Sequence, residues 1–182
     1  MHITPTEISD VFIITPQIFK DERGYFFESY NKHKLDLENI SYTFVQDNES
    51  KSSYDVIRGL HFQKPPHAQT KLLRVVQGAI LDVAVDIRTK SPTFGKYVAV
   101  KLTAENHKQF LIPAGFAHGF SVLSETAIVQ YKCTDYYHPE TEGGLIYNDP
   151  TINIDWQIPA ENAIISSKDT QQPTLADINS PF

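Results

Sequence analysis

Short runs of β-branched and aromatic residues, each closed by glycine, proline or a polar turn, limit the fold of this chain more than any other feature. Examples are VFIITP (11–16), GYFFESY (24–30), VIRGLHF (56–62), KLLRVVQG (71–78), AILDVAVDI (79–87), TAIVQYKCTDYY (126–137) and GLIYND (144–149). These residue types favour strands, and many short strands between turns are typical of an antiparallel sandwich or barrel. We therefore predict an all-β fold in one domain over residues 1–182, with a few short helices, one of them near 31–39.

The composition is that of a globular chain and argues against several kinds of partner. The net charge is −6 without a basic run, so nucleic acid is not expected as a non-specific partner. No apolar run approaches the roughly 20 residues that a membrane span needs, and the N-terminus lacks the pattern of a signal peptide. Cys133 is the only cysteine, which excludes an intrachain disulfide, so we expect a reducing, cytoplasmic location.

Two aspartates interrupt the strand expected over 79–87. Alternation places Asp82 and Asp86 on one face together with Ile80 and Ala84. The usual explanation is a solvated strand face, and it is the better one for an ordinary sandwich. In a barrel with a ligand cavity, the polar face would instead line the cavity.

The segment 56–78 carries an unusual density of cationic side chains for a sheet protein. It looks like a hairpin-like unit, two β-prone runs joined by a Pro-rich turn, and it contains Arg58, His61, His67, Lys71 and Arg74. A lone histidine in an apolar run is usually a hydrogen-bonded core residue, but interior Arg and Lys need an anionic partner. Strict alternation puts Arg58 and His61 on opposite faces, so one shared site would require a kink, for which a bulge at Gly59 would suffice. His67 and Arg74 receive no role.

A second unusual segment is LIPAGFAHGF (111–120). Pro113 and Gly115 predict a sharp turn, and Phe120 a core aromatic. His118 is the residue that these local signals leave unexplained.

These motifs together resemble a known family. PAGFAH resembles the second signature of the cupins, which are small β-barrels of the jelly-roll type. DERGYFFESYN, FVQDN, RGLHFQ, TKLLRVVQG, IPAGFAHGF, QYKCTDYY, GGLIYNDP and SSKD in combination resemble the dTDP-4-dehydrorhamnose 3,5-epimerases, from about residue 3 to 175. The resemblance implies an antiparallel jelly-roll (cupin) β-barrel, with an N-terminal segment and a C-terminal tail packed on it.

The metal ligands of the cupins are replaced in this sequence. Metal-binding cupins have a second histidine where Gln69 stands and a glutamate near the position of Lys71. A protonated lysine repels a divalent cation and cannot ligate it. We therefore predict no catalytic metal and no cofactor.

The resemblance implies a role for each matching residue. His61 would be the general base, Asp169 would orient it, Tyr131 would be the acid on the opposite face, and Lys71 would stabilise an enolate. Without the resemblance, Tyr131 would be interpreted as a core tyrosine. The implied substrate-binding residues are Arg23, Glu28, Gln46, Asn48, Arg58, Lys71, His118, Tyr137, Glu142 and Lys168.

Some of these assignments compete with simpler explanations. Spacing alone would make Glu28 and Glu142 solvated surface carboxylates. Asp82 is a candidate support for His118. The resemblance also implies a homodimer in which the N-terminal segment, with Arg23 and Glu28, contributes to the partner's site.

The implied reaction inverts carbons 3 and 5 of dTDP-4-dehydro-6-deoxy-D-glucose to give dTDP-4-dehydro-L-rhamnose. Both carbons lie next to the ketone, so both can be deprotonated through an enolate, with a base on one face and an acid on the other. One alternative is an epimerase that inverts a single centre. Others are a non-catalytic nucleotide-sugar-binding cupin and a metal-dependent cupin enzyme.

Overall fold

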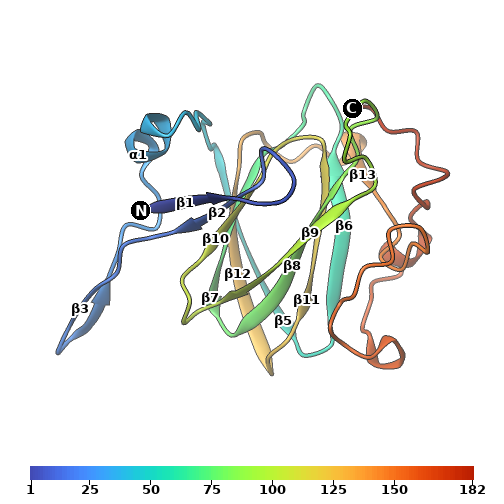
Figure 1. Ribbon diagram of the computed structural model, residues 1–182. Helices are drawn as coiled ribbons and strands as arrows, with labels where there is room; N and C mark the ends of the chain where they lie inside the picture. The colour runs from blue at the N-terminus through green and yellow to red at the C-terminus, as the bar shows by residue number, and fades with distance from the viewer.

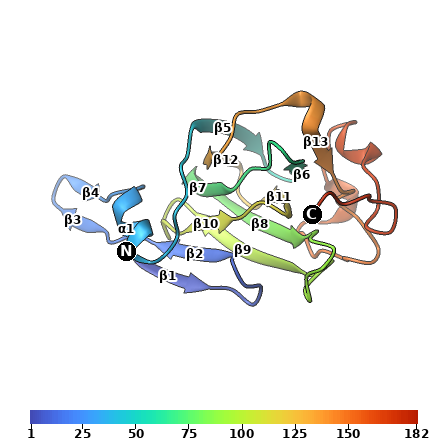
Figure 2. The same ribbon diagram turned by 90° about the horizontal axis from the view of Figure 1, so that it is seen from above.

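Two antiparallel sheets face each other in the computed structural model, which describes residues 1–182 (Figures 1 and 2). The six-stranded sheet has the order β1 (His2–Pro5), β2 (Phe12–Thr15), β10 (Gln109–Ile112), β7 (Lys71–Gln77), β12 (Thr126–Cys133), β5 (Gln46–Ser53). The five-stranded sheet has the order β13 (Glu142–Gly144), β6 (Ile57–Gln63), β11 (Phe116–Val122), β8 (Ala79–Asp86), β9 (Tyr97–Thr103). The two sheets stay separate rather than closing into one hydrogen-bonded barrel, and the prediction of an antiparallel, jelly-roll type of all-β fold is confirmed.

The remaining elements are short. A hairpin of β3 (Phe19–Asp21) and β4 (Gly24–Phe26) projects away from the sheets (Figure 1). Helix α1 (Lys32–Leu37) follows it and begins after Asn31, whose side chain accepts a hydrogen bond from the Lys34 backbone N–H, as N-caps do. The 3₁₀ helices are η1 (Pro139–Thr141), η2 (Ala160–Asn162) and η3 (Asp169–Gln171). None of the helices is long and apolar enough to cross a membrane.

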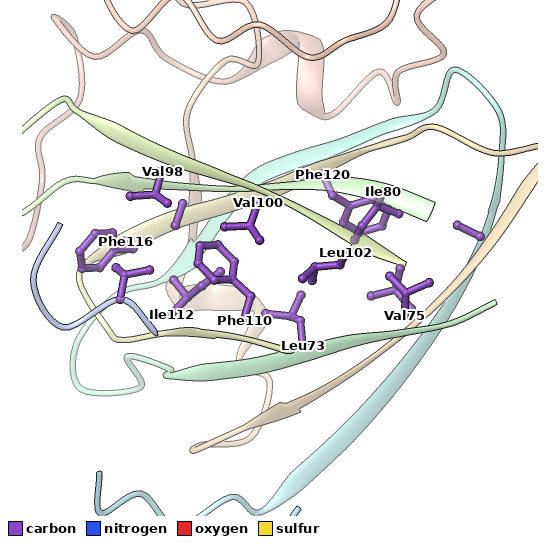
Figure 3. Close-up of a cluster of buried hydrophobic side chains, with 14 of the residues drawn as sticks. Leu73, Val75, Ile80, Val98, Val100, Leu102, Phe110, Ile112, Phe116 and Phe120 are labelled. Atoms are coloured by element: carbon purple, nitrogen blue, oxygen red, sulfur yellow. The ribbon is translucent and has the colours of Figure 1, made fainter. Parts of the chain in front are cut away.

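The main core lies between the two sheets (Figure 3). Alternation of the strands sends Leu73 and Val129 inward from the six-stranded sheet, where they meet Ile80 and Phe120 of the other sheet. Phe110, at the centre, is completely buried. Burial of each large apolar side chain stabilises the fold by roughly 1.5–3 kcal/mol.

Two further clusters cover the outer faces of the sheets. The C-terminal tail packs Ile152 and Trp156 against Leu60 and Val83 of the five-stranded sheet. On the six-stranded sheet, Leu35 of α1 belongs to a smaller cluster with Ile14, Ile40, Leu72 and Leu111. These contacts tie both ends of the chain to the sheets, and we propose that residues 1–182 form one domain.

The segment 56–78 is not the hairpin that its sequence pattern predicts. Its two strands, β6 and β7, belong to different sheets, so the Pro-rich turn crosses from one layer to the other. The predicted strand at 24–30 ends at Phe26, and strands β1 and β3 were not predicted. The strand predicted at 144–149 does not form, since β13 ends at Gly144. Short strands of this kind depend on pairing partners rather than on local pattern.

The solvated face proposed for β8 is also wrong. Its alternation is as expected, but both faces are covered, and Asp82 and Asp86 are fully buried. Asp86 accepts hydrogen bonds from Arg88, Ser91 and Thr93. Asp82 faces the interior near a cavity, which matches the alternative that we gave for a cavity-lining strand.

Candidate active site

A cavity of about 490 Å³ is lined by strands of both sheets and by the C-terminal tail. Its wall contains most of the residues that were singled out as functional: Arg58, His61, Lys71, His118, Tyr131, Lys168 and Asp169. An adjoining chamber of about 340 Å³ shares His61, Lys71 and Tyr131 and adds Gln46, Asn48, Tyr137 and Glu142. We call these the catalytic chamber and the outer chamber.

A bulge at Gly59 explains how Arg58 and His61 reach the same chamber. His61 pairs with His118 and Arg58 with Phe120, so two residues of β6 lie opposite the single residue Gly119 of β11. Gly59 has φ +115°, and a Cβ there would lie 2.6 Å from the Gly119 Cα. Only glycine tolerates this conformation and this approach. The kink that the sequence required is therefore present.

His61 and Asp169 form a hydrogen-bonded pair across the chamber wall. The His61 Nε2 lies 2.7 Å from Oδ1 of Asp169, and the Gly59 backbone N–H donates to Oδ2 at 3.2 Å. The Asp169 carboxylate is almost fully buried. Because a carboxylate only accepts hydrogen bonds, it holds the proton on Nε2 and leaves the Nδ1 lone pair of His61 free to act as a base.

His118 and Asp82 form a second, deeper pair in the same chamber. The His118 Nε2 lies 2.6 Å from Asp82 Oδ1, and both residues are buried. Burial lowers the pKa of His118, and the charge and hydrogen bond of Asp82 oppose this effect only in part. The support of His118 by Asp82, predicted as a candidate contact, is thus a direct hydrogen bond.

Lys71 and Tyr131 come from the six-stranded sheet, on the opposite side from the two histidines. Burial lowers the pKa of Lys71, while Cys133, Asp82 and Glu142 act in the other direction. Burial raises the pKa of the Tyr131 phenol, so Tyr131 keeps its proton at neutral pH. The chamber therefore presents the imidazole of His61 on one wall, and the phenol of Tyr131 and the amino group of Lys71 on the other.

The outer chamber is organised around Glu142. The Tyr137 hydroxyl donates to Glu142 Oε2 at 2.8 Å, and the Lys168 ammonium donates to the same oxygen at 2.6 Å. Burial raises the pKa of Glu142, but these two hydrogen bonds and the charge of Lys168 act against burial, and the pKa lies below its usual value. The Tyr137 backbone N–H donates to Gln46 Oε1 at 3.1 Å, and Gln46 in turn donates to Asn48. Glu142 is only 18% exposed, so it is not a simple surface carboxylate.

Two of the predicted substrate-binding residues lie outside both chambers. Arg23 is at the turn of the β3–β4 hairpin, 85% exposed, and forms an ion pair with Asp21 at 2.5 Å. Glu28 bonds Asn31 and Lys34 next to α1. Within one chain, neither residue reaches the cavity.

Sequence reasoning missed two serines of β5. Ser52 accepts a hydrogen bond from Arg58 Nε at 2.9 Å and so positions the guanidinium. Ser50 lines the catalytic chamber, and its buried hydroxyl oxygen has no hydrogen-bond partner. Alternation from Gln46 and Asn48 would have placed both serines on the same face of the strand.

Arg74, to which the sequence gives no role, and the cavity lie on opposite sides of the six-stranded sheet. Arg74 lies on its outer face, where it donates to Gln130 and sits 5.7 Å above the Phe27 ring. In the cavity, Lys71 lines the same chamber as the two histidines, and a protonated lysine repels a cation and cannot ligate it. The absence of a catalytic metal and of a cofactor stays a prediction.

Comparisons with known proteins identify close relatives. The family model described as dTDP-4-dehydrorhamnose 3,5-epimerase matches residues 5–177. A protein of that name from Escherichia coli (strain K12) is 50% identical over 179 residues, which is 98% of this chain and 96% of the relative.

Solved structures of epimerases are similar to this chain over nearly its whole length. The crystal structure of a dTDP-4-dehydrorhamnose 3,5-epimerase from Elizabethkingia anophelis NUHP1 has a TM-score of 0.94 and 51% identity, covering 99% of both chains. A dTDP-6-deoxy-D-glucose-3,5-epimerase from Legionella pneumophila Philadelphia 1, in complex with dTDP-4-keto-L-rhamnose, has a TM-score of 0.93 and 49% identity, covering 98% of this chain and 94% of that one.

Proposed function

This chain belongs to the dTDP-4-dehydrorhamnose 3,5-epimerase family, and from that membership we propose how its own residues carry out the reaction. It is an isomerase of dTDP-rhamnose biosynthesis that converts dTDP-4-dehydro-6-deoxy-D-glucose into dTDP-4-dehydro-L-rhamnose. The resemblance drawn from the sequence motifs is confirmed.

One observation carries the proposed mechanism. His61 and Tyr131 line the same chamber but come from opposite sheets, β6 in one and β12 in the other. Inversion of a carbon requires proton removal from one face of the sugar and proton delivery to the other. A sugar ring bound between the two sheets would have the imidazole on one side and the phenol on the other.

Each inversion then proceeds in two proton transfers. The Nδ1 of His61 takes the proton from carbon 3 or carbon 5, and the C–H electron pair moves into the enolate. The hydrogen bond to Asp169 stabilises the resulting imidazolium, as buried carboxylates do for catalytic histidines. Tyr131 delivers its proton to the opposite face, and solvent restores the protonation of both side chains.

The enolate oxygen needs a positive partner while it is charged. Lys71 lines the chamber, and its ammonium group would supply this positive charge. An ammonium in a poorly solvated site stabilises a developing oxyanion more than it would in water. His118, kept neutral by burial and held by Asp82, is positioned to donate or accept a hydrogen bond with the sugar.

The outer chamber and Arg58 fit the nucleotide part of the substrate. A guanidinium binds phosphate oxygens in a bidentate manner, and Arg58 is held for this by Ser52. Tyr137 is an exposed aromatic ring beside Gln46 and Asn48, a combination suited to stacking and hydrogen bonding with a thymine base. Glu142 and Lys168 connect the two chambers.

We further propose a homodimer in which the β3–β4 hairpin completes the partner's site. The hairpin exposes large apolar rings, with Phe19 54%, Tyr25 60% and Phe26 66% exposed, which suits burial in an interface. Arg23 and Glu28 lie on or next to this arm and away from their own cavity. The cytoplasm remains the predicted compartment.

Deuterium incorporation tests the mechanism directly. The 4-keto substrate is incubated with enzyme in deuterated water and followed by NMR. Label at both carbon 3 and carbon 5 with inversion is the expected result, whereas label at one carbon would indicate a single-centre epimerase and no label a binding protein.

Two variants separate the base from the acid. His61→Asn should abolish deuterium exchange at carbons 3 and 5. Tyr131→Phe should retain exchange on the face of the sugar that His61 contacts but should lose inversion. Tyr54→Phe, which removes the hydroxyl of an exposed tyrosine, is the matched control and should behave as wild type. Full inversion by Tyr131→Phe would remove Tyr131 from the acid role.

Complementation between subunits tests whether the β3–β4 hairpin completes the site of the partner. In a dimer that shares its sites in trans, Arg23→Ala and His61→Asn subunits can form a heterodimer with one intact site. A 1:1 mixture that has exchanged subunits should therefore regain about one quarter of wild-type activity. If Arg23 served its own chain, every site in the mixture would carry a defect and no activity would return.

A further inference from the structure

A group of ionisable side chains outside the catalytic machinery lies where two loops meet. His67 precedes β7, and Asp135 and His138 follow β12. The His67 Nδ1 is 3.0 Å from Asp135 Oδ2, and the rings of His67 and His138 stack at 3.4 Å between centroids, 14° from parallel. One potential ligand atom from each of the three residues lies within 4.8 Å of the others.

The chemistry of this group is that of a metal site. Two imidazole nitrogens and one carboxylate oxygen are a ligand set that zinc and other divalent transition metals use. Around an ion with bonds of about 2.1 Å, neighbouring tetrahedral ligands lie about 3.4 Å apart. Because the two stacked rings are nearly parallel, one imidazole must rotate out of the stack before both histidines can direct a nitrogen at the same ion. All three side chains are about one-third exposed, which gives an ion access and leaves room for water ligands.

A simple hydrogen bond does not account for the whole cluster. The contact with Asp135 explains the place of His67 but not that of His138, whose ring is stacked on its neighbour. The His138 Nδ1 is 3.2 Å from Glu140 Oε1, and a carboxylate bonded to one ring nitrogen commonly orients a metal-binding histidine. With neutral imidazoles, Asp135 and Glu140 leave two negative charges that a dication would neutralise.

We propose that His67, Asp135 and His138 bind a divalent transition-metal ion such as zinc, at a site distinct from the catalytic chamber. Lys71, which disfavours a metal ion inside the cavity, is not part of this cluster, and no lysine or arginine forms an ion pair with it.

The site has a consequence for the outer chamber. The two loops already touch, since the Gln69 side chain donates to the Asp135 backbone carbonyl at 2.8 Å. An ion would join them through side chains on either side of Tyr137, which lies between Asp135 and His138. The ion would thus restrict the ring of Tyr137, to which we assign stacking on the nucleotide base. This effect on nucleotide binding rests on the proposed function. Bound metal should therefore tighten the binding of dTDP.

Calorimetry tests metal binding independently of catalysis. Tag-free protein is treated with a chelator, dialysed and titrated with zinc chloride. We expect one saturable site per chain, weakened at least about tenfold in His67→Asn and in His138→Asn. His33→Asn removes an exposed histidine on α1 and should bind as wild type.

Two measurements guard against misfolded variants and indirect effects. Thermal unfolding in chelator should be the same for all four proteins. Cobalt(II) added in place of zinc should give the visible absorption of a nitrogen- and oxygen-ligated ion in wild type and lose it in the two cluster variants. Absence of saturable binding, or equal binding by the cluster variants, would overturn the site.

The effect on the nucleotide is measured separately, by titrating dTDP into the chelated and the zinc-loaded protein. A lower dissociation constant with zinc supports the restriction of Tyr137. An unchanged constant refutes that step, while failure of dTDP to bind either form would count against the proposed nucleotide site instead.

Discussion

The pairing of His61 with Asp169 gives the sharpest test of the catalytic assignment, through the variant Asp169→Asn. The carboxylate now accepts two hydrogen bonds, one from His61 and one from the Gly59 backbone N–H. An amide has only one oxygen. Because the Gly59 N–H is fixed in the bulge, the amide oxygen should turn to it, and the NH₂ group then faces His61. The histidine must accept that hydrogen bond, which moves its own proton to Nδ1, the nitrogen that we propose as the base.

The size of the effect follows from two losses. A hydrogen bond to a charged group is worth about 1.5–3 kcal/mol, and the imidazolium formed during catalysis would lose one. At about 1.36 kcal/mol per tenfold, this slows the reaction by about 10- to 150-fold. The wrong tautomer costs more, up to about 10⁴-fold when the equivalent change is made in a catalytic triad. We expect kcat to fall by about 10²- to 10⁴-fold.

The assay compares wild type, Asp169→Asn and the control Asp177→Asn, which changes an exposed carboxylate of the same tail. Proton exchange at carbons 3 and 5 is followed by NMR, and dTDP affinity is measured in parallel. The variant should bind dTDP normally and lose exchange at both carbons. Exchange near the wild-type rate, in a protein with unchanged thermal stability, would show that Asp169 does not set the tautomer of His61.

Four other perturbations probe the rest of the structure. Burial lowers the pKa of Lys71 from its usual 10.5, and only the ammonium form stabilises the enolate. In a pH–rate profile, the decline of kcat with rising pH should therefore have its midpoint below pH 10.5. In the folded protein the pKa of Asp86 is lowered from 3.8 to about 2, so the stabilisation that its carboxylate gives to the fold is present above pH 3.8 and lost as pH falls through 2. Asp86→Asn should therefore lower the free energy of unfolding by at most about 2 kcal/mol, measured by urea unfolding at pH 7. Gly59→Ala places a Cβ against the backbone of β11 and should reduce both activity and stability, the latter by more than about 1 kcal/mol in the same assay. Ser50→Ala should raise KM for the substrate without lowering thermal stability, because the hydroxyl has no partner in the free protein; an unchanged KM would exclude contact with the sugar.

Local patterns predicted those parts of the fold that local physics decides. The alternation in β8 correctly separates Ile80 and Ala84 from Leu81 and Val83, which belong to different clusters. The start of α1 follows from its Asn31 cap. The sheet to which a strand belongs is a non-local property, and for this reason the pattern of 56–78 suggested a hairpin where the chain crosses between layers.

The site was predictable to a similar extent. A kink at Gly59 was required to bring Arg58 and His61 together, and the structure has it. Burial of Asp82 was not predictable, because a strand with polar residues on one face is usually solvated on that face. Ser50 could have been found by alternation, whereas His67 and Asp135 are 68 residues apart in the chain and only the tertiary structure brings them together.

The distance along the chain between His61 and Asp169 has a consequence for how activity arises. The carboxylate comes from the tail, 108 residues after the histidine. During translation, both sheets can therefore assemble around an imidazole that still lacks its partner. The chain would become able to remove protons only once this last segment has been synthesised and has folded back. A protease that removed the residues from Asp169 onward would take away the carboxylate together with apolar side chains that cover the five-stranded sheet, such as Leu175 and Ile178, and would lower both activity and stability.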